Sequence, residues 1–216
     1  MMVIETLIYV ALVIALFFVC DNSLSRRFYV PVKVVCSASF LVVLWINQMF
    51  SEKLWLMFWA LLACFIGDIF MAIYNTSLNK QVIALGIIAF MIGHVGLLNY
   101  MCRVTDKTNV LVYIVPVCAC LLVVGLRKWL HLHMGSLFVP CIIYSYFVST
   151  MAIKAVECGL NGMPLCGIAG VLFLFSDITI MIRSFYHFKN KKNKRVAHYL
   201  ELGTYYAAIL LFIFSL

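Results

Sequence analysis

The sequence predicts an all-α, polytopic membrane protein whose chain crosses the bilayer eight times. Of its 216 residues, 66% are hydrophobic and only 11% are charged, whereas a soluble domain is about half apolar and a quarter charged. The mean hydropathy is +1.09, so the chain carries more apolar surface than its own core can bury, and most of that surface must face lipid. These values exclude a soluble globular protein.

Eight apolar windows of membrane-spanning length follow one another along the chain. At 1.5 Å per residue each window can cross about 30 Å of hydrocarbon, the shortest two with little room for tilt. Only brief loops separate them, which predicts a single transmembrane domain over residues 1–216. The windows are residues 3–20, 30–46, 54–74, 82–101, 110–126, 134–153, 164–182 and 199–216.

Lysine and arginine residues are unequally divided between the two sides of the membrane. One side carries twelve, with the densest run in residues 189–195, and the other carries four: Lys53, Arg103, Lys107 and Lys154. Because cytoplasmic loops are enriched in basic residues, we expect the twelve on the cytoplasmic side of an inner (plasma) membrane and both termini outside. The run either fixes this topology or docks on anionic headgroups. The charge of +8 thus reflects topology, and we expect no nucleic-acid partner.

Neither the cysteines nor the histidines form a recognisable metal motif. The nine cysteines contain no CxxC pair, which favours small apolar packing residues, although a disulfide between Cys158 and Cys166 stays an alternative. His94 has no second histidine at helical spacing, so a metal site from Asp68, His94 and Asp177 is weakly indicated. We expect no metal and no cofactor.

Ionisable side chains within the windows indicate where a function lies, because charge inside a membrane is costly. Asp68 and Asp177 lie six and five residues before the cytoplasmic ends of their windows, which is about 8 to 9 Å deep. Asp177 shares a helix face with Gly170 and Phe173, and glycines mark helix contacts in membranes. We therefore expect both carboxylates to converge inside the bundle.

Other polar groups lie near these carboxylates in depth. Lys33 enters from the same side, Glu201 and Tyr205 share one face of the last helix, and His94 is deeper. A structural alternative stays open for each: the two aspartates as partners of Lys33 or of the backbone, His94 as a packing residue, and Lys33 and Glu201 as side chains that extend to the interface.

A pair of buried carboxylates favours acid catalysis. When two such groups lie close together in a low dielectric, they cannot both ionise easily, so one holds a proton at neutral pH. The sequence contains no nucleophile elbow, phosphate-binding loop, zinc motif or dinucleotide fingerprint that would indicate another chemistry.

Five short blocks of residues stand out within the helices. They are Gly67-Asp68, Gly86-x3-Phe90-x3-His94, Pro140-x3-Tyr144 with Met151 and Ala155, Phe173-x2-Ser176-Asp177, and Thr204-Tyr205-Tyr206-Ala207. In these blocks the chain resembles the YhhN-type lysoplasmalogenase family, and the resemblance covers most of the chain. The resemblance implies a small eight-span hydrolase that cleaves the vinyl ether bond of lysoplasmalogens to a fatty aldehyde and glycerophosphoethanolamine or glycerophosphocholine.

The implied reaction needs one acid and one anion. A vinyl ether hydrolyses when its β carbon is protonated, and the resulting oxocarbenium ion is captured by water, much as carboxylate pairs act in glycosidases. We assign the acid to Asp177, in its Phe-rich setting, and the anion to Asp68, with the reverse assignment left open. Tyr205 and His94 would orient water or the ether oxygen.

The expected partners are an alkenyl lysophospholipid, water and the lipid bilayer. The lipid would enter from the cytoplasmic leaflet with its phosphate near Lys33, Arg26 or Arg27. The residues predicted to bind substrate are Lys33, Tyr144, Ser176, Glu201 and Tyr206.

A proton-coupled transporter of a small molecule or lipid is the competing interpretation, with Asp68 and Asp177 as its proton relay. The third and seventh windows run in the same direction, and each contains a small residue, Asp and Ile in succession. This match indicates a duplicated four-helix unit, a symmetry that transporters show. A structural or regulatory membrane protein is a third alternative, which leaves the buried carboxylates unexplained.

Overall fold

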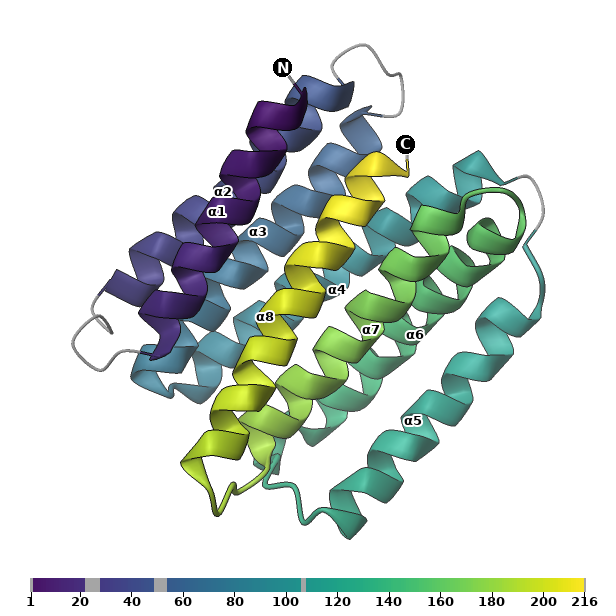
Figure 1. The fold of residues 1–216 in the computed structure, drawn as a ribbon. Helices are drawn as coiled ribbons and strands as arrows, with labels where there is room; N and C mark the ends of the chain where they lie inside the picture. Colours follow the sequence, from purple (N-terminus) through teal and green to yellow (C-terminus); the bar gives the residue numbers. More distant parts are fainter. Residues whose placement is uncertain (1, 22–27, 49–53, 106–107, 216) are drawn as a thin grey trace. The chain divides into compact units, whose positions relative to one another are not determined.

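The computed structural model describes residues 2–21, 28–48, 54–105 and 108–215. Within these ranges, eight α-helices are long and apolar enough to cross a membrane (Figure 1), which confirms the predicted fold class. Their bounds are α1 (Met2–Asp21), α2 (Tyr29–Gln48), α3 (Leu54–Ser77), α4 (Lys80–Val104), α5 (Leu111–Trp129), α6 (Phe138–Leu160), α7 (Pro164–Phe185) and α8 (Lys191–Phe214), with a short 3₁₀-helix, η2 (Gly135–Leu137), before α6.

Several helices extend past their apolar windows, which corrects three predictions. α6 and α7 continue far enough to include Lys154 and Arg183, both predicted in loops. α8 begins at Lys191, eight residues before its window. Lysine and arginine form helices well, and the Asn190 side chain caps α8 by accepting a 2.8 Å hydrogen bond from the backbone N–H of Lys192. The basic run is therefore mostly helical.

The eight helices indicate an integral multi-pass membrane protein, and its orientation stays a prediction. Four of the counted basic residues lie outside the described residues: Arg26, Arg27, Lys53 and Lys107. Two of them, Arg26 and Arg27, were also predicted near the lipid phosphate.

The chain divides into two compact units, Met1–Leu97 and Leu98–Ser215, with the boundary inside α4. When α1 to α4 are paired in order with α5 to α8, each later helix begins 109 to 111 residues after its counterpart. This regular offset is what duplication of a four-helix unit produces. That all 216 residues form one domain stays a prediction.

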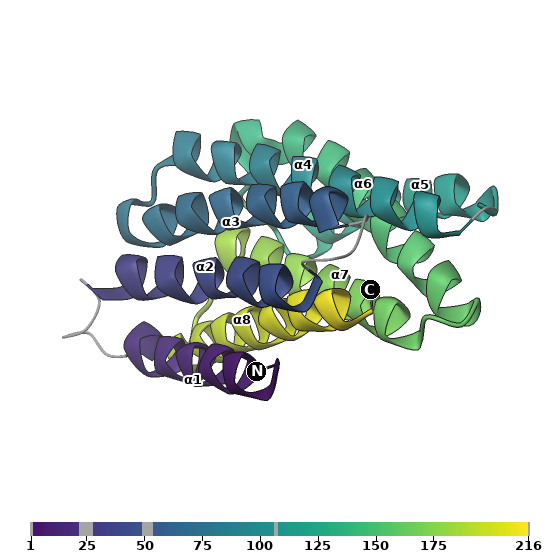
Figure 2. The ribbon, with the colours of Figure 1, turned by 90° about the horizontal axis from the view of Figure 1, so that it is seen from above.

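In the first unit, α1 packs on α2 and α2 packs on α3 (Figure 2). Small residues allow α4 to approach α3 closely. A Cβ atom at Gly93 would lie 2.5 Å from the Cys64 Sγ, and one at Gly96 would lie 2.8 Å from the Ala60 Cβ. Side chains at these two positions would force the helices apart. The close packing accompanies complete burial of His94, which lies between the two glycines in sequence.

In the second unit, α5 to α8 also pack against one another in chain order. α6 and α7 approach closely where Gly159 meets Gly167, since a Cβ atom on Gly159 would lie 2.9 Å from the Gly167 Cα. Further along α7, Gly170 packs against Ala155. Gly170 and Asp177 are both buried, as the predicted inward face of α7 requires.

Candidate functional site

Asp68 lies on the buried face of α3 and is held by two side chains of α2. Its side chain is only 2% exposed, and the Lys33 Nζ lies 3.3 Å from its Oδ1. The Ser37 hydroxyl donates a 2.8 Å hydrogen bond to its Oδ2. Lys33 and Ser37 are four residues apart, so they share one face of α2 and reach the same carboxylate. Two donors on two oxygens favour an ionised, fixed carboxylate.

The ion pair also answers a question that the sequence left open for Lys33. The Lys33 side chain is 4% exposed and ends at Asp68, so it does not extend to an interface. Lys33 is thus an ion-pair partner of Asp68, and the choice between a structural and a functional role for this pair stays open. A role for Lys33 near a lipid phosphate stays a prediction.

Two further residues of this site were not predicted from the sequence. Ser37 is completely buried, and Tyr9 of α1 is buried and interacts electrostatically with Asp68. A serine or tyrosine in an apolar helix resembles an ordinary packing residue, and for that reason neither stood out. For Ser37, the available signal was its position one turn after an intramembrane lysine.

Asp177 lies one helical turn after Phe173 on α7, and aromatic rings pack around Phe173. The Phe173 ring is 5.3 Å from that of Tyr205, centroid to centroid, and 6.4 Å from that of Phe212. The ring of Tyr206 lies 5.0 Å from that of Tyr205. All of these side chains are buried. The Phe-rich setting expected for Asp177 from the sequence stays a prediction, because these ring contacts are those of Phe173 and of residues on α8.

The polar contacts between α7 and α8 centre on Glu201. Arg183 forms an ion pair with Glu201 through its Nε and through its Nη2, which lies 3.1 Å from Oε1. The Ser176 hydroxyl donates a 3.0 Å hydrogen bond to the Glu201 backbone carbonyl. Glu201 is 2% exposed, which contradicts the alternative of a side chain that extends to the interface. Arg183 was missed because the charge count assigned it to a loop.

The predicted site residues divide between the two units. Lys33, Asp68 and His94 belong to the first unit. Within the second unit, contacts join Ser176 to Glu201 and Tyr205 to Tyr206, while Tyr144 lies half-buried on α6. The convergence of Asp68 with Asp177 stays a prediction. Within the described ranges, no cluster of three or more His, Cys, Asp or Glu side chains offers a metal site.

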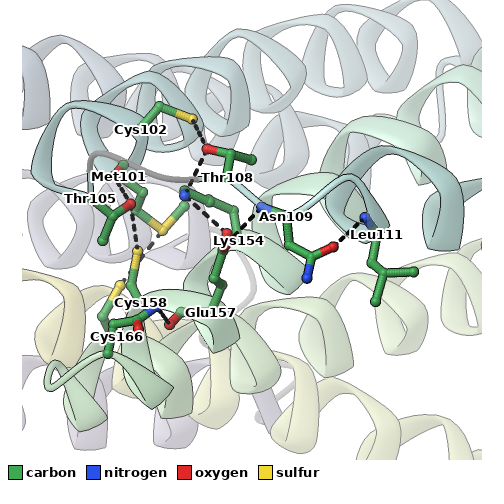
Figure 3. A network of polar contacts seen from close by, with 11 residues as sticks. Met101, Cys102, Thr105, Thr108, Asn109, Leu111, Lys154, Glu157, Cys158 and Cys166 are labelled. Atoms are coloured by element: carbon green, nitrogen blue, oxygen red, sulfur yellow. Dashed lines mark hydrogen bonds and ion pairs between the residues drawn. The ribbon is translucent and has the colours of Figure 1, made fainter.

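Another polar cluster of the second unit lies near the C-terminal end of α6 (Figure 3). Lys154 is completely buried and donates to the Glu157 Oε2 and the Thr108 Oγ1, each at 2.9 Å. The Glu157 Oε1 accepts the backbone N–H of Asn109 at 2.8 Å. These bonds fasten the segment before α5 to α6, so this lysine acts as a structural residue.

Cys158 and Cys166 meet beside this cluster through their side chains, and both are free thiols. The disulfide that the sequence left open is not formed. The Cys166 Sγ donates to the Met101 Sδ at 3.6 Å, and the Thr105 hydroxyl lies 3.8 Å from the Cys158 Sγ (Figure 3). These buried contacts fit the interpretation of the cysteines as packing residues.

The fold and its buried ion pairs define a helical integral membrane protein with polar sites inside its spans. Residues 27–216 match the profile of the YhhN family, and the chain belongs to that family. The resemblance identified from the five sequence blocks is thereby confirmed. No curated protein and no solved structure matches the chain. Members of the family are lysoplasmalogenases, which suggests a lysoplasmalogenase-like hydrolase with a lipid substrate.

Proposed function

We propose that this protein hydrolyses the vinyl ether bond of lysoplasmalogens and releases a fatty aldehyde and glycerophosphoethanolamine or glycerophosphocholine. The observation that carries the proposal is the Asp68 carboxylate, which Lys33 and Ser37 hold inside a spanning helix of a YhhN-family chain. An oxocarbenium ion needs a nearby anion, and a carboxylate kept ionised in a low dielectric interacts strongly with such a cation.

Asp177 is the proposed acid. Its carboxyl proton goes to the β carbon of the vinyl ether, and the electrons of the double bond form the new C–H bond. The ether oxygen shares the resulting positive charge as an oxocarbenium ion. The aromatic rings around Phe173 and Tyr205 support this assignment, because apolar surroundings favour the neutral form of a carboxylic acid.

Asp68 is the proposed anion that stabilises the cation. Water adds to the carbon that bears the ether oxygen, and the proton that it loses returns to Asp177. The resulting hemiacetal collapses: its bond to the glycerol oxygen breaks, that oxygen takes up the hydroxyl proton, and the aldehyde leaves. This division of labour follows the carboxylate pairs of glycosidases.

The remaining predicted residues position the reactants in this proposal. His94 and Tyr205 orient water or the ether oxygen. Tyr144, Ser176, Glu201 and Tyr206 contact the lysolipid, with Lys33 on the side from which its phosphate enters.

The direct test is incubation of the purified protein in detergent with an alkenyl lysophospholipid, followed by measurement of free aldehyde. We expect turnover that falls at both acid and alkaline pH, because the reaction needs one ionised and one protonated carboxyl group. It should also be slower in heavy water, because the slow step transfers a proton to carbon. Failure to hydrolyse any vinyl ether lipid at any pH would overturn the proposal.

A proton-coupled transporter is the second candidate, favoured by the regular 109-to-111-residue offset between the helices of the two units. Hydrolysis needs no proton gradient, whereas net transport does. Aldehyde release in detergent would make transport unnecessary as an account of the carboxylates. Gradient-driven lipid flux in vesicles without aldehyde release would favour the transporter.

A further inference from the structure

We propose that Ser37 is a positioning residue that holds the Asp68 carboxylate as a correctly oriented anion. This inference deepens the proposed hydrolysis and rests on it. Ser37 lies outside the residue blocks of the family resemblance, and its part in the site comes from the geometry of α2 against α3.

The hydroxyl of Ser37 donates to a different kind of acceptor from those of two buried hydroxyl residues on α6. Ser149 donates to the carbonyl of Ser145 at 2.6 Å, and Thr150 donates to the carbonyl of Tyr146 at 2.7 Å. Such bonds to the preceding turn satisfy a hydroxyl within its own helix. Ser37 donates to a carboxylate on the neighbouring helix. Ser176 also reaches a neighbouring helix, but its acceptor is the backbone carbonyl of Glu201, so the Ser37 bond is the one of the two that orients an ionisable side chain.

Lys33 and Ser37 contribute different things to the Asp68 carboxylate. The Lys33 Nζ is 3.3 Å from Oδ1, which is longer than the usual 2.7–2.9 Å of a charge-assisted N–H bond. The Ser37 bond to Oδ2 is 2.8 Å, close to the preferred length for a hydroxyl donor. Lys33 therefore supplies most of the opposing charge, and Ser37 fixes the plane of the carboxylate.

Orientation of this anion matters for the proposed reaction. A donor that is in place before the reaction needs no rearrangement when positive charge develops on the substrate. If the Ser37 hydroxyl is removed, the carboxylate can rotate about its side-chain bond and is protonated at a higher pH. Both effects lower the rate of the chemical step and leave lipid binding largely unchanged.

Other titratable groups lie on the helices of the same unit and accompany any pH dependence of Asp68. Tyr9 interacts electrostatically with both Asp68 and Cys36. The buried titratable side chains of α1 to α4 in this unit are Tyr9, Tyr29, Lys33, Cys36, Cys64 and His94. The Ser37→Ala substitution removes only the serine hydroxyl and keeps all of these side chains. A shift of the pH–rate profile in that variant therefore reports on the bond to Asp68.

The experiment compares Ser37→Ala with Ser149→Ala, a matched control that removes a buried hydroxyl bonded only to its own helix in the contacts described above. For Ser37→Ala we expect kcat on an alkenyl lysophospholipid to fall about tenfold or more with little change in KM. The acid limb of its rate profile should move up by about one pH unit. Ser37→Thr keeps the hydroxyl and should recover most of the rate, while Ser149→Ala should resemble the wild type.

Two outcomes separate this inference from the proposed function. If the wild type is active, the role of Ser37 is overturned by either of two results, and hydrolysis still stands. One is an unshifted pH–rate profile in Ser37→Ala; the other is an equal loss of kcat in the Ala and Thr variants. Inactive wild type would overturn the hydrolysis. In that case infrared spectra still test the geometry: the Asp68 carboxyl band, identified by its loss in Asp68→Asn, should appear in its protonated form at a higher pH in Ser37→Ala. An unmoved band would contradict the inference.

Discussion

The two units place an aspartate at the same point of their third helix but surround it differently. In the first unit, Asp68 itself takes part in the ion pair, which joins α2 to α3 through Lys33. In the second unit, an ion pair between Arg183 and Glu201 joins α7 to α8, and Asp177 lies one turn after Phe173, whose ring packs against that of Tyr205.

This difference teaches how one repeated position can serve two chemical roles. A carboxyl group beside a cation and a hydroxyl donor is favoured as an anion, whereas one among aromatic rings is favoured as a neutral acid. Glu201, a carboxylate that α8 supplies, forms an ion pair with Arg183. In the proposed mechanism, the neighbouring helices therefore set the role of each aspartate.

The largest effect is expected from removing either aspartate. Asp68→Asn and Asp177→Asn keep the shape of the side chain, and each should lower aldehyde release by about 10²–10⁴-fold. The double variant should be little worse than either single one, because residues that act as a unit are not additive. Steady-state kinetics on folded, monodisperse protein measures this. Mild or additive losses would assign both residues to structure.

Breaking the ion pair of the first unit should act on both stability and activity. Lys33→Met leaves the Asp68 carboxylate buried without its ammonium partner, which costs about 3–5 kcal/mol of stability. Combining it with Asp68→Asn should recover much of that loss, as thermal unfolding in detergent would report. Activity should stay absent in the combined variant, because the anion is gone; recovered turnover would contradict the role given to Asp68.

The ion pair between Arg183 and Glu201 should affect stability more than the chemical step when it is broken. Arg183→Met should destabilise the protein by a similar amount, and the combination with Glu201→Gln should restore stability, since it removes both buried charges. Here the combined variant should keep its kcat and show a higher KM, because Glu201 is placed with the substrate. If kcat instead fell as far as it does in Asp177→Asn, the Arg183–Glu201 ion pair would be as important for the chemical step as the ion pair of the first unit.

The smallest effect is expected from the bond that joins Ser176 to the backbone of α8. Ser176→Ala leaves the Glu201 carbonyl without this donor, which costs about 0.5–1.5 kcal/mol. Differential scanning fluorimetry of the variant beside the wild type should show a modest drop in Tm. A drop as large as that of Lys33→Met would indicate that Ser176 does more than join α7 to α8.

The sequence alone determined the eight spanning helices, because apolar windows of that length have no stable place outside a bilayer. It also singled out Asp68, Asp177 and Glu201, since charge is rare inside such windows. It misplaced the ends of α6 and α7, where a window stops at the first charged residue although the helix continues, and the start of α8, which lies in the basic run before its window. The charges of Lys154 and Arg183 were counted in loops for that reason.

Only the tertiary structure decided which partners these charges take. Helical periodicity assigns a residue to a face of its own helix, but it does not say which helix packs against that face or at what height. The contacts of Ser37 and Lys33 with Asp68, and of Arg183 with Glu201, depend on helix pairing and on the register of one helix along another. Packing sets that register, through close approaches such as Gly159 to Gly167, where the absence of side chains lets two helices touch.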